Sequence, residues 1–151
     1  MDPYQTLCDD HQRLDALYEA WLNGVHVNDA EVEERAWSEL DRQLAAHLEA
    51  EDTHLLPLFD AFDPAEAAAI RAEHVRIRQL AAELGVLLDI HAVRETKAAE
   101  LIAFLRTHAA REEAKLYPWA NRALPEAPRQ SFLQRLREAR NAVTAPRGAA
   151  P

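Results

Sequence analysis

Histidines and glutamates recur in two matching segments of the chain. HLEAEDTHLLP at residues 47–57 aligns with HAAREEAKLYP at residues 108–118 when the sequence is shifted by 61 residues. Both segments carry a histidine, a glutamate four residues later, a second acid beside it, and a proline ten residues after the histidine. A shorter match relates DHQRL at residues 10–14 to EHVRI at residues 73–77. Each half of the chain therefore offers an acid–histidine pair followed by a His-x-x-x-Glu pair.

These residue types and this spacing suit a metal site. Four residues of an α-helix turn through about 400°, so a histidine and a glutamate at positions i and i+4 project from one face. Imidazole binds iron, zinc and copper, and carboxylates can bridge two hard ions. Two octahedral metals have more coordination positions than six side chains fill, which leaves open positions for O2 or peroxide. The candidate metal ligands are His11, His47, Glu51, His74, His108 and Glu112.

An alternative interpretation is that these six side chains only hydrogen-bond to one another inside a helical bundle. A buried carboxylate without a compensating charge is costly, and two facing carboxylates are more so. The duplication of the whole set therefore favours metal ligation over the purely structural alternative.

The elements that would position these residues are four long helices. Prolines leave two long proline-free tracts, and each tract opens with Asp-Pro, a helix-start pattern, at residues 2–3 and 63–64. A glycine near the middle of each tract is followed four residues later by a candidate N-cap, Asn28 or Asp89. With apolar residues at helical spacing, this predicts helices at about 3–26, 29–56, 64–87 and 90–117.

The predicted fold is all-α. Short connections make consecutive helices antiparallel neighbours, which gives an up-down-up-down four-helix bundle over residues 1–120. The six candidate ligands then meet at one end of the bundle, provided that the first and third helices continue past Gly24 and Gly85. Residues 121–143 are expected to contain a short C-terminal helix, at about 126–142, and residues 144–151 to be a disordered tail.

The two long matching segments, together with DHQRL and EHVRI, resemble the haemerythrin-like (HHE cation-binding) family over roughly residues 5–120. The resemblance implies a non-haem centre of two iron ions, bridged by oxo or hydroxo. It also implies that the four histidines are terminal ligands and that Glu51 and Glu112 bridge the irons. Members of the family include reversible O2 carriers, sensors of O2, NO or iron, and proteins active on peroxide.

One departure from the family pattern bears on function. The oxygen carriers place a second histidine one turn after the third-helix histidine, where this chain has Arg78. A missing imidazole leaves an open position, which favours oxidase, peroxidase or catalase-like turnover over storage. Arg78 is either a surface residue or lines that open side and positions an anionic or peroxidic ligand.

Further residues lie near the predicted site. Tyr18 is a candidate ligand, hydrogen-bond donor or radical site, with an ordinary core tyrosine as the alternative. Tyr117 is expected to pack at the end of the bundle, with a role near the site as the alternative. His54 is expected to lie on the rim of the site, with ligation as the alternative, and His91 to lie at the opposite end. Four acids could accept a hydrogen bond from the outer ring N–H of a ligating histidine, although solvated charge is the alternative for most of them: Asp10, Asp15, Glu73 and Glu113.

Composition narrows the partners and the compartment. Asp and Glu number 26 against 17 Lys and Arg, a net charge of -9, which disfavours nucleic acid and anionic membranes as partners. The single cysteine, Cys8, excludes an intrachain disulfide and a zinc site built on several thiolates. Neither a signal-peptide pattern nor an apolar stretch of about 18 residues occurs, so a cytoplasmic protein is expected.

Three functions follow as hypotheses. The first is an oxidoreductase acting on O2 or H2O2, the second a reversible binding module for O2, NO or iron, acting as carrier or sensor, and the third a structural bundle without metal. The expected partners are O2, H2O2 or NO as small ligands, and the expected state is a monomer or weak homodimer. Arg78 in place of a histidine favours the first hypothesis, and the second is kept as the alternative.

Overall fold

The computed structural model describes residues 2–93 and 95–142, and within these ranges every regular element is a helix. The prediction of an all-α fold is therefore confirmed for the described residues. The helices are α1 (Pro3–His26), α2 (Ala30–His54), α3 (Leu56–Phe62), α4 (Pro64–Asp89), α5 (Glu95–Ala114), α6 (Leu116–Ala123) and α7 (Glu126–Asn141).

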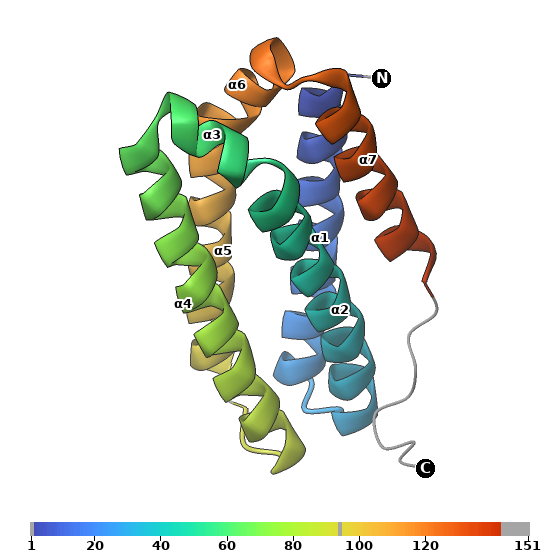
Figure 1. The fold of residues 1–151 in the computed structure, drawn as a ribbon. Helices are drawn as coiled ribbons and strands as arrows, with labels where there is room; N and C mark the ends of the chain where they lie inside the picture. Colours follow the sequence, from blue (N-terminus) through green and yellow to red (C-terminus); the bar gives the residue numbers. More distant parts are fainter. Residues whose placement is uncertain (1, 94, 143–151) are drawn as a thin grey trace, which may run out of the picture.

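The four long helices α1, α2, α4 and α5 pack side by side (Figure 1). The short helices α3 and α6 close one end of them, and α1 and α4 run away from this end while α2 and α5 return to it. Helix α7 packs along the outside of α2. The arrangement places early residues of α1 and α4 beside late residues of α2 and α5.

The helix starts follow the sequence in α1 and α4 and depart from it in α2 and α5. The side chains of Asp2 and Asp63 accept hydrogen bonds from the backbone N–H of the first turn, as the Asp-Pro pattern predicts. Asn28 is not the N-cap of α2: its φ of 54° places it in a left-handed turn, and Asp29 caps the helix instead. Asp89 is the last residue of α4, so α5 begins only at Glu95 and not at 90.

The expected helices to 56 and 117 are each interrupted near the repeated proline. The chain leaves α2 at Leu55 and α5 at Lys115 and immediately starts the short helices α3 and α6. Pro57 and Pro118 lie in the first turn of these helices, where a proline is tolerated because its missing N–H has no intrahelical partner. The proline therefore marks a change of helix direction at the closed end of the bundle.

Buried apolar residues form two clusters. The long-helix cluster, between α1, α2, α4 and α5, includes Leu14 and Trp37. The cap cluster, around α3, α6 and α7, includes Leu7 and Phe132. On α1 the candidate ligand His11 lies between Leu7 of one cluster and Leu14 of the other. Apolar packing on both sides keeps bulk water away from this polar layer.

The C-terminal helix agrees with its predicted range. Phe132, Leu133 and Leu136 are buried, as the apolar stripe of α7 predicts. The tail expected at residues 144–151 lies outside the described residues. Among the described helices, none combines the length and the apolar character that a membrane span requires.

Candidate metal centre

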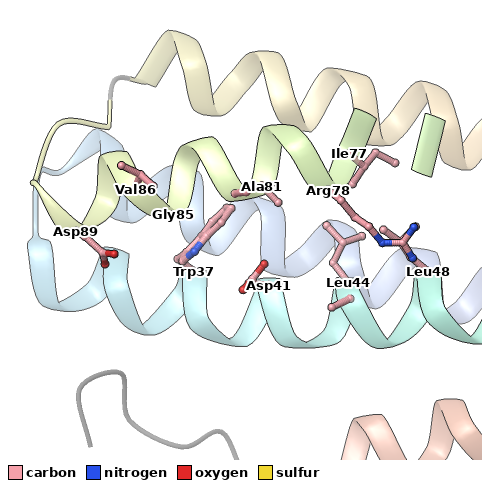
Figure 2. Close-up of a pocket in the computed structure, with 12 residues that line it drawn as sticks. Trp37, Asp41, Leu44, Leu48, Ile77, Arg78, Ala81, Gly85, Val86 and Asp89 are labelled. Atoms are coloured by element: carbon pink, nitrogen blue, oxygen red, sulfur yellow. The ribbon is translucent and has the colours of Figure 1, made fainter. Parts of the chain in front are cut away.

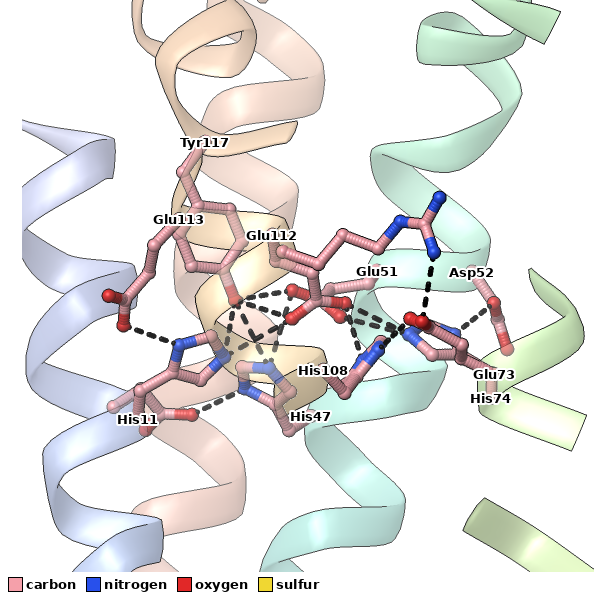
Figure 3. A network of polar contacts seen from close by, with 12 residues as sticks. His11, His47, Glu51, Asp52, Glu73, His74, His108, Glu112, Glu113 and Tyr117 are labelled. Carbon is pink, nitrogen blue, oxygen red and sulfur yellow. Dashed lines mark hydrogen bonds and ion pairs between the residues drawn. The ribbon is translucent and has the colours of Figure 1, made fainter. Parts of the chain in front are cut away.

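The six candidate ligands come together between α1, α2, α4 and α5 (Figure 3). Glu51 and Glu112 lie at the centre and are 0% exposed, and the four histidines are at most 9% exposed. The ligand atoms form two groups, within each of which they lie within 4.8 Å of one another. The first group is His11, His47, Glu51 and Glu112, and the second group is Glu51, His74, His108 and Glu112. Both glutamates belong to both groups, which is the arrangement two bridged cations require.

Each histidine ring turns its Nε2 atom toward these glutamates. The shortest distances from Nε2 to a glutamate oxygen are 3.2 Å for His11, 3.3 Å for His47, 3.1 Å for His74 and 2.8 Å for His108. The Nε2 atoms are therefore presented inward from four different helices.

The opposite ring nitrogen, Nδ1, meets a carboxylate in every case. The contacts are His11 to Glu113 at 2.9 Å and His47 to Asp10, His74 to Asp52 and His108 to Glu73 at 2.7 Å each. A carboxylate that accepts the Nδ1–H proton fixes the ring orientation and leaves the Nε2 lone pair for a metal. The pattern is common around metal-ligating histidines and is present here on all four.

These carboxylates follow the internal repeat. Asp10, Glu73 and Glu113 were among the four acids predicted to accept a hydrogen bond from the outer ring N–H of a histidine, and the structure confirms these hydrogen bonds. The nomination of Asp15 is wrong, because its carboxylate pairs with Arg106, whose Nε lies 2.6 Å from Asp15 Oδ1. Asp52 takes the fourth place, and the alignment of Asp52 with Glu113 in the long repeat is the signal that could have identified it.

Electrostatics ties the carboxylates and imidazoles together. Burial favours the neutral form of Glu112, but its contacts with the imidazoles of His108, His11 and His74 hold its pKa well below the usual range. Burial likewise opposes protonation of His74, yet the surrounding carboxylates raise its pKa to about 11. In the metal-free protein, imidazolium protons therefore balance the buried negative charge. Bound cations would balance the same charge and displace those protons.

Two buried atoms test whether a metal fits. Glu51 Oε2 and His108 Nε2 have no well-directed hydrogen bond to any described residue. His108 Nε2 lies 2.8 Å from a Glu112 oxygen, but the contact lacks hydrogen-bond geometry. Glu51 Oε2 lies 3.4 Å from His74 Nε2, at the long end for an ion pair. Buried polar atoms that lack a well-directed hydrogen bond are costly, and both atoms carry electron pairs that can ligate iron. The donor set and its unsatisfied atoms therefore fit a metal centre.

The structure adds Tyr117 to the centre. Its hydroxyl donates to Glu51 Oε1 at 2.6 Å and lies 2.8 Å from His11 Nε2 and 3.3 Å from both His47 Nε2 and Glu112 Oε2. The phenol is buried, and burial together with the nearby carboxylates raises its pKa well above the usual range, so the hydroxyl keeps its proton. The structure therefore favours the alternative given for Tyr117, a role near the site, over packing at the end of the bundle.

The change of direction at Lys115 explains why helical periodicity does not predict the contact between Tyr117 and the glutamates. In an unbroken helix, a residue five positions after Glu112 would point about 140° away from it. Because α5 ends at Ala114 and α6 starts at Leu116, the phenol instead turns back toward the glutamates. The repeat places Leu56, which is fully buried, at the position equivalent to Tyr117. The first group therefore has a hydroxyl beside it where the second has a leucine.

Comparison with known proteins places the chain in a family. The sequence model that matches is the Hemerythrin HHE cation binding domain, over residues 2–120. The chain belongs to this family. No curated protein and no solved structure matched it. Haemerythrin HHE domains bind iron, and the two groups provide a cluster of histidines and glutamates that could hold it.

Four other residues considered from the sequence lie outside the two groups of this HHE domain. Tyr18 is part of the long-helix cluster, and its hydroxyl contacts none of the six candidate ligands among the described residues. Arg78 is 46% exposed and binds Asp52 Oδ2 through a guanidinium nitrogen at 2.6 Å. His54 is half-buried at the end of α2, and His91 is exposed after α4.

Proposed function

We propose that the protein is a non-haem di-iron protein that binds and reacts with O2 or peroxide, in the manner of an oxidase, peroxidase or catalase. The four histidines would be terminal ligands, and Glu51 and Glu112 would bridge the two irons. The observation that carries this proposal is that two four-residue groups share both glutamates. Iron held there would supply Lewis acidity and redox chemistry toward oxygen species.

The residues of the chain have separable roles. The carboxylates on the Nδ1 atoms hold the imidazoles in position, and the two apolar clusters exclude bulk water. Tyr117 holds a proton at Oη and can donate it to an oxygen species in the first group, as it donates to Glu51 in the metal-free protein. A buried donor beside a metal position can stabilise a negatively charged oxygen species.

The position of Arg78 supports turnover over storage. Its guanidinium binds Asp52 and is 46% exposed, so among the described residues no fifth imidazole or other side chain from this part of α4 joins the second group. Each group then offers two histidines and the two shared glutamates, which leaves coordination positions open to solvent or substrate in both groups, and open positions favour reaction. Reversible binding of O2, NO or iron is the alternative, and the closed, largely dry surroundings of the glutamates favour it.

The test is iron content together with the absorption spectrum, recorded without oxygen, then with O2, then with H2O2. We expect about two irons per chain and evolution of O2 from peroxide or another net reaction. A stable adduct that releases O2 on evacuation would instead identify a carrier or sensor. A protein that binds no iron would leave only the structural bundle.

Variants of the two groups sharpen the test. His47→Ala and His108→Ala each remove a donor from one group and are expected to leave about one iron, while Glu51→Ala removes a shared donor and is expected to lose both. His91→Ala is the matched control, because this exposed histidine lies outside both groups. Retention of two irons by both histidine variants would contradict the ligand assignment.

A further inference from the structure

Two grooves run along the long helices beside the metal centre. The α1–α5 groove has a volume of 460 Å³ and is lined by His11 and Glu113, by the polar residues Gln12, Asp15 and Arg106, and by alanines. The α2–α4 groove has a volume of 340 Å³ and is lined mainly by apolar side chains, Trp37, Leu44, Leu48 and Ile77 among them (Figure 2). The two grooves differ in the residues that lie at their floors.

Only one of these two grooves reaches a candidate ligand. His11 lines the α1–α5 groove, and at 9% it is the most exposed of the four candidate histidines. The α2–α4 groove ends against Leu48 and Ile77, which are 1% and 0% exposed and belong to the long-helix cluster. A molecule in the second groove is therefore separated from the glutamates by packed apolar side chains.

Small side chains keep the α1–α5 groove open. Ala16 of α1 and Ala109 and Ala110 of α5 lie along it, where larger residues would fill the space. Glu113 lines the groove beside His11, is 39% exposed, and accepts the Nδ1–H of His11 (Figure 3). The groove thus leads from solvent along Glu113 to a histidine whose other nitrogen is 2.8 Å from the Tyr117 hydroxyl.

The charge at the mouth selects the kind of molecule that can pass. Arg106 is paired with two acids, Asp15 at 2.6 Å and Glu19 at 2.5 Å, and Glu113 adds a third. Three carboxylates against one guanidinium give this wall a negative charge, which repels anions. Gln12, which also lines the groove, offers a hydrogen bond to a small neutral molecule such as H2O2.

We propose that the α1–α5 groove is the entry path for a small, neutral, hydrogen-bonding oxidant, hydrogen peroxide, to the first group. The inference rests on the proposed function and adds the side of the centre from which the substrate arrives. It also assigns specificity: the groove admits neutral peroxide faster than anionic ligands of the same size.

Blocking variants test the path. Ala109→Phe places a large ring in the α1–α5 groove, and Ala81→Phe does the same in the α2–α4 groove from an equally half-buried position. With stopped-flow absorption of the iron-loaded protein, we expect Ala109→Phe to lower the second-order rate constant for H2O2 about tenfold and Ala81→Phe to leave it within about twofold. Ala16→Phe, from the opposite wall, repeats the test if the first variant folds poorly.

The charge assignment has its own test. Glu19→Gln removes one of the three carboxylates near Arg106 and is expected to raise the rate constant for binding of azide, an anion. The rate constant for the reaction with H2O2, a neutral molecule, is expected to stay the same. The proposed path would be refuted if Ala109→Phe and Ala16→Phe both reacted with H2O2 at the wild-type rate. It would also be refuted if Ala81→Phe alone slowed the reaction. Iron content and the resting spectrum of each variant are measured first. Normal values with unchanged rates refute the path alone, whereas an iron-free wild type refutes the proposed function and the path together.

Discussion

Replacing Tyr117 by phenylalanine removes the hydroxyl that contacts four of the six candidate ligands. The hydroxyl is fully buried and donates to Glu51 Oε1 at 2.6 Å. Its removal leaves a buried carboxylate whose other oxygen already has no well-directed hydrogen bond to a described residue. A hydrogen bond to a charged group contributes about 1.5–3 kcal/mol. We therefore expect Tyr117→Phe to lower the free energy of unfolding of the metal-free protein by about this amount.

Tyr18→Phe is the matched control. Tyr18 is also a buried tyrosine, but it lies on α1 in the long-helix cluster, and its hydroxyl makes no hydrogen bond to either glutamate. Urea unfolding of the metal-free proteins, followed by circular dichroism, gives both free energies. The expected loss for Tyr18→Phe is about 0.5 kcal/mol or less, because that hydroxyl makes no hydrogen bond to a described residue. Equal losses for the two variants would refute the role assigned to Tyr117.

Three further outcomes are expected. Asp52→Ala removes the acceptor for His74 Nδ1 and should weaken iron binding about 10- to 100-fold, as measured by competition with a chelator. Asp15→Ala is the control and should leave iron binding unchanged, because Asp15 pairs with Arg106 and not with a candidate histidine. In the metal-free protein, the raised pKa of His74 contributes stability that is complete below pH 6.5 and is lost as the pH rises toward about 11. The lowered pKa of Glu112 contributes stability that is present above pH 4.5 and is lost on acidification. Thermal unfolding should therefore show maximal stability near about pH 5–6.5, and greater stability at pH 9 than at pH 6 would contradict the assignment. Gly24→Ala would place a Cβ 3.0 Å from the backbone of α2 and should cost about 1–3 kcal/mol, which a wild-type melting temperature would disprove.

Much of the centre was predictable because its information is duplicated in the sequence. Helical spacing alone places His47 beside Glu51 and His108 beside Glu112, and the Asp-Pro starts fix which ends of the helices meet. The bundle needs only to bring two such helices together. The acids that bind Nδ1 were partly predictable for the same reason, since they stand next to a histidine or a glutamate in each copy.

The remaining features depend on local breaks that periodicity does not report. Tyr117 enters the centre only because the chain changes direction at Lys115, and its neighbour in the sequence pattern, Pro118, is compatible with several geometries at the start of a helix. Asp89 has the residue type of an N-cap but continues α4, because apolar packing of Leu84 and Leu88 extends that helix. Tertiary contacts outweigh capping preference at such positions.

The two halves of the centre match in their ligands and differ in their surroundings, and the differences agree with one another. The first group has the Tyr117 hydroxyl, the most exposed candidate histidine and the α1–α5 groove. The second has Leu56 at the equivalent position, and its His74 is 0% exposed behind Asp52 and Arg78. A proton donor and an access path are both needed where an oxygen species reacts, whereas a closed, firmly hydrogen-bonded site suits a metal that stays in place. For the di-iron centre that we propose, these differences favour reaction on the side of Tyr117.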